Sequence, residues 1–434
     1  MRTREPTHLR GPSRWSPGRR RLLSSLPALP RLPVSSAPVY DQGMMEVVIC
    51  DGVRTPFGKL GGGLSQTAAP ALGAVVLKAL VERNRLEHAA IDHVIMGTVL
   101  AAGQGQVPSR QATLLAGFPP SIPSFTVNKV CASSLKAINL AASMIRAGDA
   151  RLVLAGGMES MSNAPYLLRD YRFGSKLGDR TAVDSLVYDG LCCPVDGVHM
   201  GVHGGEVAAE LSVTRQAQDE WAYRSQQRYA AALANGIPAA EIVPVETPSG
   251  VVDRDEQPRP DTTLEKLASL KPAFSPGATV TAGNSPGIND GAAAVIVASR
   301  ERAEELGLTV LATWVSFGQS AEEHPYLATV PALALQDAVT RAGGKPSVPE
   351  LSLLEINEAF AAVAITSTSM LSVSPDIVNV NGGAIALGHP IGASGARLLL
   401  TLIGELRRRG GGYGGATLCS GLAQGEATIV RVDA

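Results

Sequence analysis

The chain has 434 residues, of which 45% are hydrophobic and 18% charged, and its formal net charge is -1. Such a length and apolar content can bury more than one hydrophobic core. The near-neutral charge argues against nucleic acid or an anionic membrane as the main partner, and no apolar stretch is long enough to span a bilayer. The five cysteines show no CxxC pair and no zinc-type spacing, which predicts free thiols in a reducing compartment.

Residues 1–43 are rich in Arg and Pro, hold only Glu5 and Asp41 as acids, and show no sustained periodicity, so we place them outside the fold. An Arg- and Ser-rich, acid-poor segment is typical of a mitochondrial transit peptide, although its prolines oppose an amphipathic helix. The alternative is a disordered or spurious extension with initiation at Met44 or Met45. We favour this second interpretation, and with it a cytoplasmic location.

Cys131 lies between a predicted strand, 124–130, and a predicted helix, 132–147, with Gly148 as its C-cap and a further strand from 151 to 154. A thiol at a helix N-terminus meets the positive end of the helix dipole and nearby backbone N–H groups. Both favour the thiolate, which is the form that attacks carbonyls. The ordinary alternative is a small buried core residue.

Two later segments carry matching chemistry. The stretch NVNGGAIALGHPIGASG, at 379–395, predicts a strand end, a glycine-rich loop that carries His389, and a helix start. The stretch ATLCSG, at 416–421, ends a predicted strand at Cys419, and 426–432 predict a returning strand. Two thiols and one imidazole on loops after strands suit thioester exchange, which needs a nucleophile, a base and a further acid/base.

In these segments the chain resembles the thiolase family, from about Met45 to the C-terminus. The matching motifs, in order, are NKVCASSLKA at 128–137, NEAF at 357–360, GHP at 388–390 and CSG at 419–421. Four ordered motifs are highly specific, whereas one alone would be weak. Departures at 132–134 and 422–424, where the family commonly has glycines, concern the shape of the pocket more than its chemistry.

The resemblance implies an α/β fold with a five-layer αβαβα core, built from two similar βαβαβαββ halves with an inserted loop domain that binds coenzyme A. We place the N-terminal half at 44–160 plus 289–309, the loop domain at 161–288 and the C-terminal half at 310–434. A Val-Asn pair leads into Cys131 in one half and His389 in the other, consistent with two similar halves. Within the insertion, 215–233 predict a charged amphipathic helix.

The resemblance also implies the catalytic roles. Cys131 is the acylated nucleophile, His389 assists its deprotonation, and Cys419 is the second acid/base. Asn357 holds a water that completes one oxyanion hole with His389, and the backbone N–H groups of Cys131 and Gly421 form the other. The ordinary alternative for Asn357, which follows a predicted strand and opens a helix, is an N-cap.

Candidate coenzyme A and acyl contacts lie in the insertion. His199-Met200 resembles the His-Met-Gly of short-chain family members, Phe274 their acyl-pocket aromatic, and Ala282-Gly283 the strand that meets the pantetheine, while Arg259 could meet the nucleotide. The alternatives are a His with local hydrogen bonds, a core Phe and a solvated Arg. The residues without a motif are read as structural: His203, Cys50, Cys192 and Cys193.

The resemblance implies that two acetyl-CoA molecules condense to acetoacetyl-CoA and coenzyme A, and that the reverse thiolysis also occurs. Coenzyme A thioesters are then substrates, with no metal or redox cofactor, and a homodimer or homotetramer is expected. Three alternatives stay open: a degradative 3-ketoacyl-CoA thiolase of longer chain preference, a decarboxylating condensing enzyme, and a non-catalytic acyl-CoA-binding subunit. The second thiol, Cys419, disfavours the condensing enzyme, and retention of all three reactive groups disfavours the subunit.

A chain that begins at Met45 should have the same kcat, melting temperature and oligomer mass as the full chain. The composition of 1–43 cannot bury enough apolar surface to offset the entropy of ordering it. Calorimetry and light scattering on the two chains test this expectation. A lower melting temperature or a smaller oligomer after truncation would show that the segment is structural.

Overall fold

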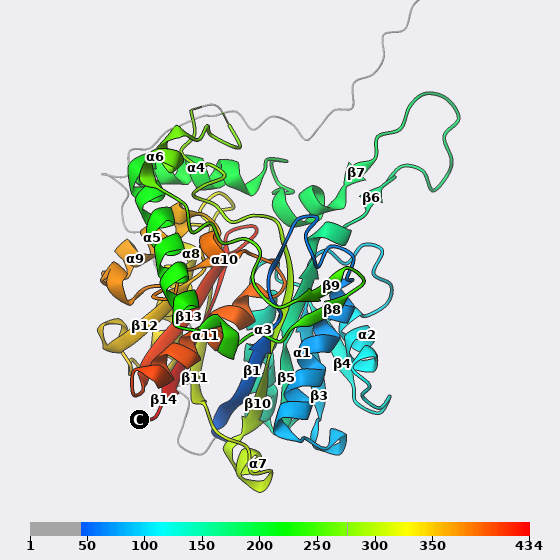
Figure 1. The fold of residues 1–434 in the computed structure, drawn as a ribbon, viewed down its shortest axis with the longest axis vertical. Coiled ribbons are helices and arrows are strands. Elements are labelled where there is room, and N and C mark those ends of the chain that lie inside the picture. Colours follow the sequence, from blue (N-terminus) through cyan, green and yellow to red (C-terminus); the bar gives the residue numbers. More distant parts are fainter. Residues whose placement is uncertain (1–44, 276) are drawn as a thin grey trace, which may run out of the picture. The chain divides into compact units, whose positions relative to one another are not determined.

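The computed structural model describes residues 45–275 and 277–434, so the predicted extension at 1–43 lies outside the described residues. Two series of alternating strands and helices follow one another, with a long insertion inside the first (Figure 1). The first series comprises β1 (Val47–Arg54), β2 (Gly58–Lys59), α1 (Ala69–Asn84), β3 (His93–Gly97), α2 (Pro108–Leu115), β4 (Ser124–Val127), α3 (Ser133–Ala147), β5 (Leu152–Ser160), β10 (Asn289–Ser299) and α7 (Arg300–Glu305).

The second series lies in the C-terminal part of the chain and repeats this alternation. It comprises β11 (Ala312–Ala321), α8 (Val330–Arg341), β12 (Leu351–Ile356), α9 (Ala361–Met370), α10 (Ala384–Leu387), α11 (Ser394–Arg408), β13 (Gly412–Ser420) and β14 (Gln424–Val432). The predicted helix after Cys131, its C-cap Gly148 and the two strands around Cys419 are all present within a few residues of their expected ends.

One ten-stranded sheet contains both series, in the order β12-β13-β14-β11-β1-β10-β5-β3-β4, with β2 paired to β10. The two halves of this sheet meet where β1 pairs antiparallel with the first residues of β11, from Val47 opposite Trp314 to Ile49 opposite Ala312. The β10 strand is buried along its whole length, as a strand covered on both faces must be.

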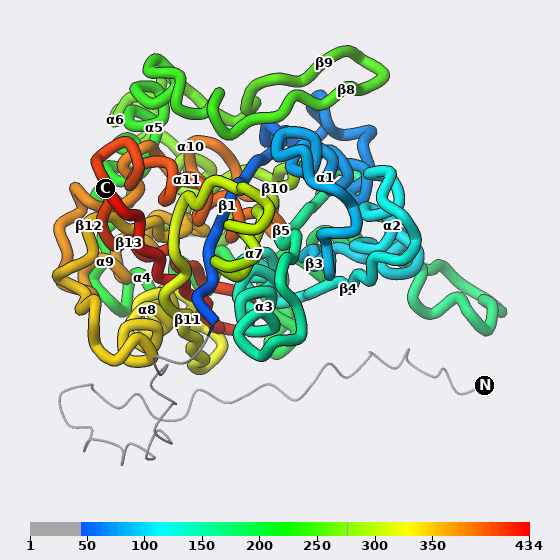
Figure 2. Tube along the Cα trace, turned by 90° about the horizontal axis from the view of Figure 1, so that it is seen from below, coloured from blue at the N-terminus to red at the C-terminus, as the bar shows by residue number. Residues whose placement is uncertain are grey.

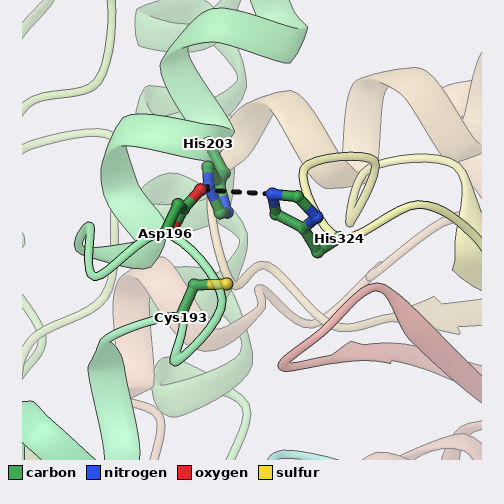
Figure 3. A group of neighbouring side chains, drawn as sticks. All are labelled: Cys193, Asp196, His203 and His324. Atoms are coloured by element: carbon green, nitrogen blue, oxygen red, sulfur yellow. Dashed lines mark hydrogen bonds and ion pairs between the residues drawn. The ribbon is translucent and has the colours of Figure 1, made fainter. Parts of the chain in front are cut away.

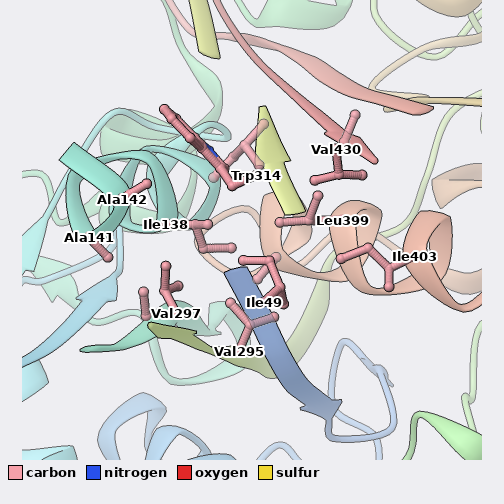
Figure 4. Close-up of a cluster of buried hydrophobic side chains, with 14 of the residues drawn as sticks. Ile49, Ile138, Ala141, Ala142, Val295, Val297, Trp314, Leu399, Ile403 and Val430 are labelled. Carbon is pink, nitrogen blue, oxygen red and sulfur yellow. The ribbon is translucent and has the colours of Figure 1, made fainter. Parts of the chain in front are cut away.

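Five layers result from this arrangement. Helices α3 and α11 lie between the two halves of the sheet, where Ile138 and Leu399 belong to one apolar cluster with strand residues such as Val295 and Val430 (Figure 4). The α1 and α2 helices cover the outer face of the first half, and α8 and α9 cover that of the second. The predicted αβαβα fold class is therefore confirmed.

The predicted strand end before the His389 loop is absent. Only an isolated bridge between Leu354 and Val378 remains there. Asn379 adopts a left-handed conformation with φ 49°, and its side chain bonds both the N–H and the C=O of Ile356, each at 2.8 Å. The asparagine amide thus replaces the ladder bonds that a further strand residue would make. The strand before Cys131 is also shorter than predicted, because the chain turns after Val127.

The insertion covers one end of the sheet with two small hairpins and three helices (Figures 1 and 2). These elements are β6 (Tyr166–Leu167), β7 (Val183–Asp184), α4 (Met200–Glu210), α5 (Arg215–Ala234), β8 (Val245–Thr247), β9 (Gly250–Val252) and α6 (Leu264–Ser269). The predicted helix at 215–233 is α5, whose Trp221 and Ala222 pack onto the outer face of the C-terminal half. Among the described residues, no helix is both long and apolar enough to cross a membrane.

Replacing Gly157 in β5 by alanine should destabilise the protein by about 2–4 kcal/mol, since overpacking against backbone has no easy relief. A Cβ there would lie 2.0 Å from the carbonyl oxygen of Gly392 and 2.8 Å from the Cβ of Ser134. Gly404→Ala in α11 is the matched control, because only the flexible Arg408 side chain lies nearby, at 3.4 Å, and alanine favours helix. Equal melting temperatures for the two variants would contradict this account of the packing.

Candidate active site

Cys131 lies in a tight turn between β4 and α3. The preceding residue, Val130, has φ 44°, which is strained for a β-branched side chain. The Ser133 hydroxyl holds the turn, since it donates to the carbonyl of Val130 at 2.6 Å and accepts the N–H of Lys129 at 2.8 Å. Ala132 occupies the N-cap position of α3. The thiol therefore sits just outside the first turn of the central helix.

Burial dominates the electrostatics of this thiol and raises the pKa of Cys131 to about 12. The backbone N–H groups of Cys131 and Gly421 act in the opposite direction, while the charge of Glu159 adds to the increase. The expectation that the helix terminus would favour a resting thiolate is thus not met. The loss of solvation at this site outweighs the hydrogen bonds, so the free thiol is the ground state.

His389 lies in the glycine-rich loop before α11, where two hydrogen bonds hold it. Its backbone N–H donates to Asn289 Oδ1 at 2.9 Å, and its Nδ1 lies 2.6 Å from the Ser394 hydroxyl. The Ser394 hydroxyl donates its hydrogen to the carbonyl oxygen of Pro390, at 2.9 Å. It can therefore only accept the hydrogen bond that His389 Nδ1 donates. The imidazole therefore keeps a lone pair on Nε2, which is the atom a base needs.

The imidazole is neutral at physiological pH. Burial lowers the pKa of His389 to about 3, and the positive charge of Arg397 acts in the same direction. Arg397 is itself buried and pairs with Glu355 at 2.8 Å, beneath the loop. A neutral thiol and a neutral imidazole that line the same cavity can exchange a proton when a substrate carbonyl is attacked.

Asn357 does not cap α9, whose N-cap is Phe360, without any capping side chain. The Asn357 Nδ2 lies 3.3 Å from His389 Nε2, and its buried Oδ1 has no hydrogen-bond partner among the described residues. A buried unsatisfied amide oxygen is costly and usually marks a functional site. The N-cap interpretation is therefore wrong, and the amide faces the imidazole.

Glu358, next in the chain, fixes the loop that carries Asn357. Its buried carboxylate accepts hydrogen bonds at 2.7 to 3.1 Å from four donors: Trp221 Nε1 and Ser225 Oγ on α5, Asn379 Nδ2 and the N–H of Ile385. One carboxylate thus links α5, the NEAF loop and the start of the glycine-rich loop. Sequence reasoning assigned Glu358 no role, although its place inside a matched motif was a signal.

Cys419 is the penultimate residue of β13, and its thiol is buried. Burial raises the pKa of Cys419 well above its usual range, and the neighbouring Cys131 adds to this effect. The hydroxyl of Ser420 donates to the carbonyl of Lys129, and the ammonium of Lys129 pairs with Glu426 in β14 at 2.7 Å. These bonds tie the turn of the first thiol to the hairpin of the second.

One mostly apolar cavity collects the predicted reactive groups. Its lining includes Cys131, His389, Cys419 and Gly421, together with His199, Met200 and Phe274 from the insertion. The His199 ring stacks on Phe274 at 4.3 Å between centroids, and its Nδ1 accepts the N–H of Gly201 at 3.0 Å as the N-cap of α4. His199 thus makes the local hydrogen bond of the ordinary interpretation and also forms a wall of the cavity.

Three predicted coenzyme A contacts are not among the lining residues. Ala282 and Arg259 are exposed, and Gly283 packs toward the side chains of Leu267 and Leu270. The segment that does reach the cavity lies slightly further along, at 285–288, just before β10. There the Ser285 hydroxyl donates to the carbonyl of Thr281 at 2.7 Å.

Comparison with known proteins agrees with this geometry. Residues 47–301 match the family profile "Thiolase, N-terminal domain", and residues 308–432 match "Thiolase, C-terminal domain". The chain is 47% identical over 393 residues to an acetyl-CoA acetyltransferase of Cupriavidus necator, covering 89% of this chain and all of that one. It is 46% identical over 390 residues to one of Thiocystis violacea, covering 89% and 98% of the two chains.

A solved structure has a similar fold. The crystal structure of the Bacillus anthracis acetyl-CoA acetyltransferase superposes with a TM-score of 0.87 at 37% sequence identity, covering 90% of this chain and 99% of that chain. These similarities agree with the four ordered motifs, the five-layer fold and the cavity that two thiols and an imidazole share. The chain belongs to the thiolase family.

Proposed function

We propose that this protein is an acetyl-CoA C-acetyltransferase, which interconverts two acetyl-CoA molecules with acetoacetyl-CoA and coenzyme A. The observation that carries the proposal is the single cavity lined by Cys131, Cys419 and His389. Claisen chemistry between thioesters needs one thiol to hold an acyl group and a second group to move a proton at carbon. The similarity to acetyl-CoA acetyltransferases over most of the chain supports the same activity.

In the first half-reaction, the Cys131 thiol attacks the carbonyl of an acyl-CoA. The Nε2 lone pair of His389 accepts the thiol proton as the carbon–sulfur bond forms, because both groups are neutral at rest. Cys419 protonates the departing sulfur of coenzyme A, so the acyl group remains on Cys131. The high pKa of the Cys419 thiol suits an acid that must stay protonated until this step.

In the second half-reaction, the deprotonated Cys419 removes a proton from the methyl carbon of a second acetyl-CoA. The resulting carbanion attacks the acyl group on Cys131, and the bond from the carbonyl carbon to the Cys131 sulfur breaks. The sulfur takes back the proton that His389 had accepted, and Cys419 keeps the proton from the methyl carbon. Each half-reaction places negative charge on a carbonyl oxygen. The N–H groups of Cys131 and Gly421, which already point at the Cys131 sulfur, can receive one such charge, and His389 with a water on Asn357 can receive the other.

A short acyl group fits the walls of the cavity best. Phe274 stacks on His199 and meets Phe360 edge to face, with centroids 6.2 Å apart. Leu327 lines the same end of the cavity and belongs with Phe360 to one apolar cluster. These aromatic rings make that part of the cavity wall bulky, which favours a short acyl group and makes the degradative enzyme of longer chain preference the less favoured alternative.

Coenzyme A thioesters act as substrates in this scheme, and the steps above need no metal or redox cofactor. A homodimer or homotetramer and a cytoplasmic location remain part of the proposal. They rest on the resemblance and on the composition of residues 1–43, respectively.

Substituting each thiol in turn should distinguish their two roles. Cys131→Ala should abolish acyl-enzyme formation, seen as the loss of the acetyl adduct in intact mass after brief incubation with acetyl-CoA. Cys419→Ala should acylate but lose condensation by at least about 10³-fold, because its proton transfer at carbon has no substitute. Cys192→Ala is the matched control and should behave as the parent chain. A Cys419→Ala variant that acylates no better than Cys131→Ala would contradict the division of roles.

Chain-length preference is a second test. In a series of 3-ketoacyl-CoA thioesters, kcat/KM for thiolysis should be highest for acetoacetyl-CoA. It should fall by at least about tenfold once the acyl chain exceeds the space before Phe274 and Phe360. Phe274→Ala should enlarge that space and so reduce the differences in kcat/KM between short and longer thioesters. A maximum at medium or long chains in the parent protein would overturn the short-chain assignment.

A further inference from the structure

A second cluster of reactive side chains lies outside the cavity. Cys193 and Asp196 belong to the loop after a short π-helical segment, His203 lies on α4, and His324 lies in the loop between β11 and α8 (Figure 3). Each residue offers one donor atom, and these atoms all lie within 4.8 Å of one another. None of the four residues lines the proposed active-site cavity.

The carboxylate of Asp196 is the centre of the cluster. Its Oδ2 lies 2.6 Å from His203 Nε2 and 3.2 Å from His324 Nε2 (Figure 3). The Cys193 thiol also hydrogen-bonds this carboxylate. Two imidazole nitrogens, one sulfur and one oxygen therefore converge from two parts of the chain that are distant in sequence.

Two members of the cluster are buried, whereas Asp196 is exposed and His324 is partly exposed. Cys193 is 1% exposed and His203 2% exposed. The other ring nitrogen of His203, Nδ1, has no hydrogen-bond partner among the described residues, so this buried ring depends on the cluster for its polar contacts.

We propose that Cys193, Asp196, His203 and His324 form a zinc site. One thiolate, two imidazoles and one carboxylate are the ligand types that Zn²⁺ takes in tetrahedral sites, whereas Mg²⁺ and Ca²⁺ prefer oxygen alone. Ligand bonds of about 2.0–2.3 Å place tetrahedral donors about 3.3–3.8 Å apart. Donor pairs at the 4.8 Å limit would close by about 1.0–1.5 Å, and Asp196 Oδ2 and His203 Nε2, now 2.6 Å apart, would open by about 0.7 Å. Binding releases the thiol proton of Cys193.

The position of the site indicates its use. His203 stands one turn after His199 and Met200, which open α4 and line the cavity. His324 lies shortly before Leu327, which lines the cavity from the C-terminal half. Zinc would thus connect the start of α4 to the loop before α8, two segments that line the acyl cavity. It would be a structural ion that contacts no substrate. This effect on acyl binding rests on the proposed function, whereas zinc binding itself does not.

The experiment measures zinc binding to the full chain after chelator treatment. It is done in a Cys131→Ala/Cys419→Ala background, so that the catalytic thiols cannot bind the ion. This protein should bind one Zn²⁺ per chain by elemental analysis and gain about 3 °C or more in melting temperature. Cobalt(II) in place of zinc should give a thiolate-to-metal charge-transfer band. Because activity is not measured, failure here leaves the proposed function untouched.

Cys192→Ser is the matched control, since this adjacent cysteine lies outside the cluster. It should keep the stoichiometry, the thermal shift and the cobalt band. Cys193→Ser should lose the band and weaken zinc binding by at least about 100-fold. His324→Gln, on a partly exposed loop, gives a second variant if Cys193→Ser folds poorly, and should lose the thermal shift. No thermal shift in the parent background, or equal zinc affinity in Cys192→Ser and both ligand variants, would overturn the proposal.

Discussion

The close approach of α3 and α11 at their N-terminal ends is the constraint on which the site depends. A Cβ on Gly395 would lie 2.7 Å from the backbone nitrogen of Leu135, so only glycine permits this contact. The Ser134 hydroxyl accepts the N–H of Ala396 at 2.9 Å across the same interface. Each helix is preceded by a loop that carries one reactive side chain. Fixing the two helix starts against each other therefore brings Cys131 and His389 to one cavity.

Burial explains both the stability of this arrangement and its chemistry. The same apolar layers that hold the two helices remove water from the thiols and the imidazole, and this loss of solvation keeps all three neutral at rest. A site of this kind is activated by the substrate, because charge appears only as a proton moves between neighbours. The buried carboxylate of Glu358 supports it by joining three segments through four hydrogen bonds, which leaves the Asn357 amide free to face the imidazole.

Sequence patterns predicted the loops of Cys131, His389 and Cys419, because each depends on a local alternation of strand, turn and helix, while the fold class came from the resemblance to the thiolase family. They failed where tertiary contacts replaced local rules. Asn379 substitutes for a strand residue through its side chain, and the strained Val130 turn shortens β4. The raised pKa of Cys131 was missed for a related reason, since helix position is visible in sequence whereas burial is not.

The sequence by itself determined the motifs, the family and the identity of the reactive side chains, since these follow from residue types in a short, ordered spacing. Tertiary structure alone decided which residues reach the cavity, placing 285–288 there and leaving Ala282, Gly283 and Arg259 outside its lining. It also brought His324 to Cys193, Asp196 and His203, a grouping without any sequence spacing to reveal it. Contacts between distant segments depend on how layers pack, and packing is a property of the whole chain.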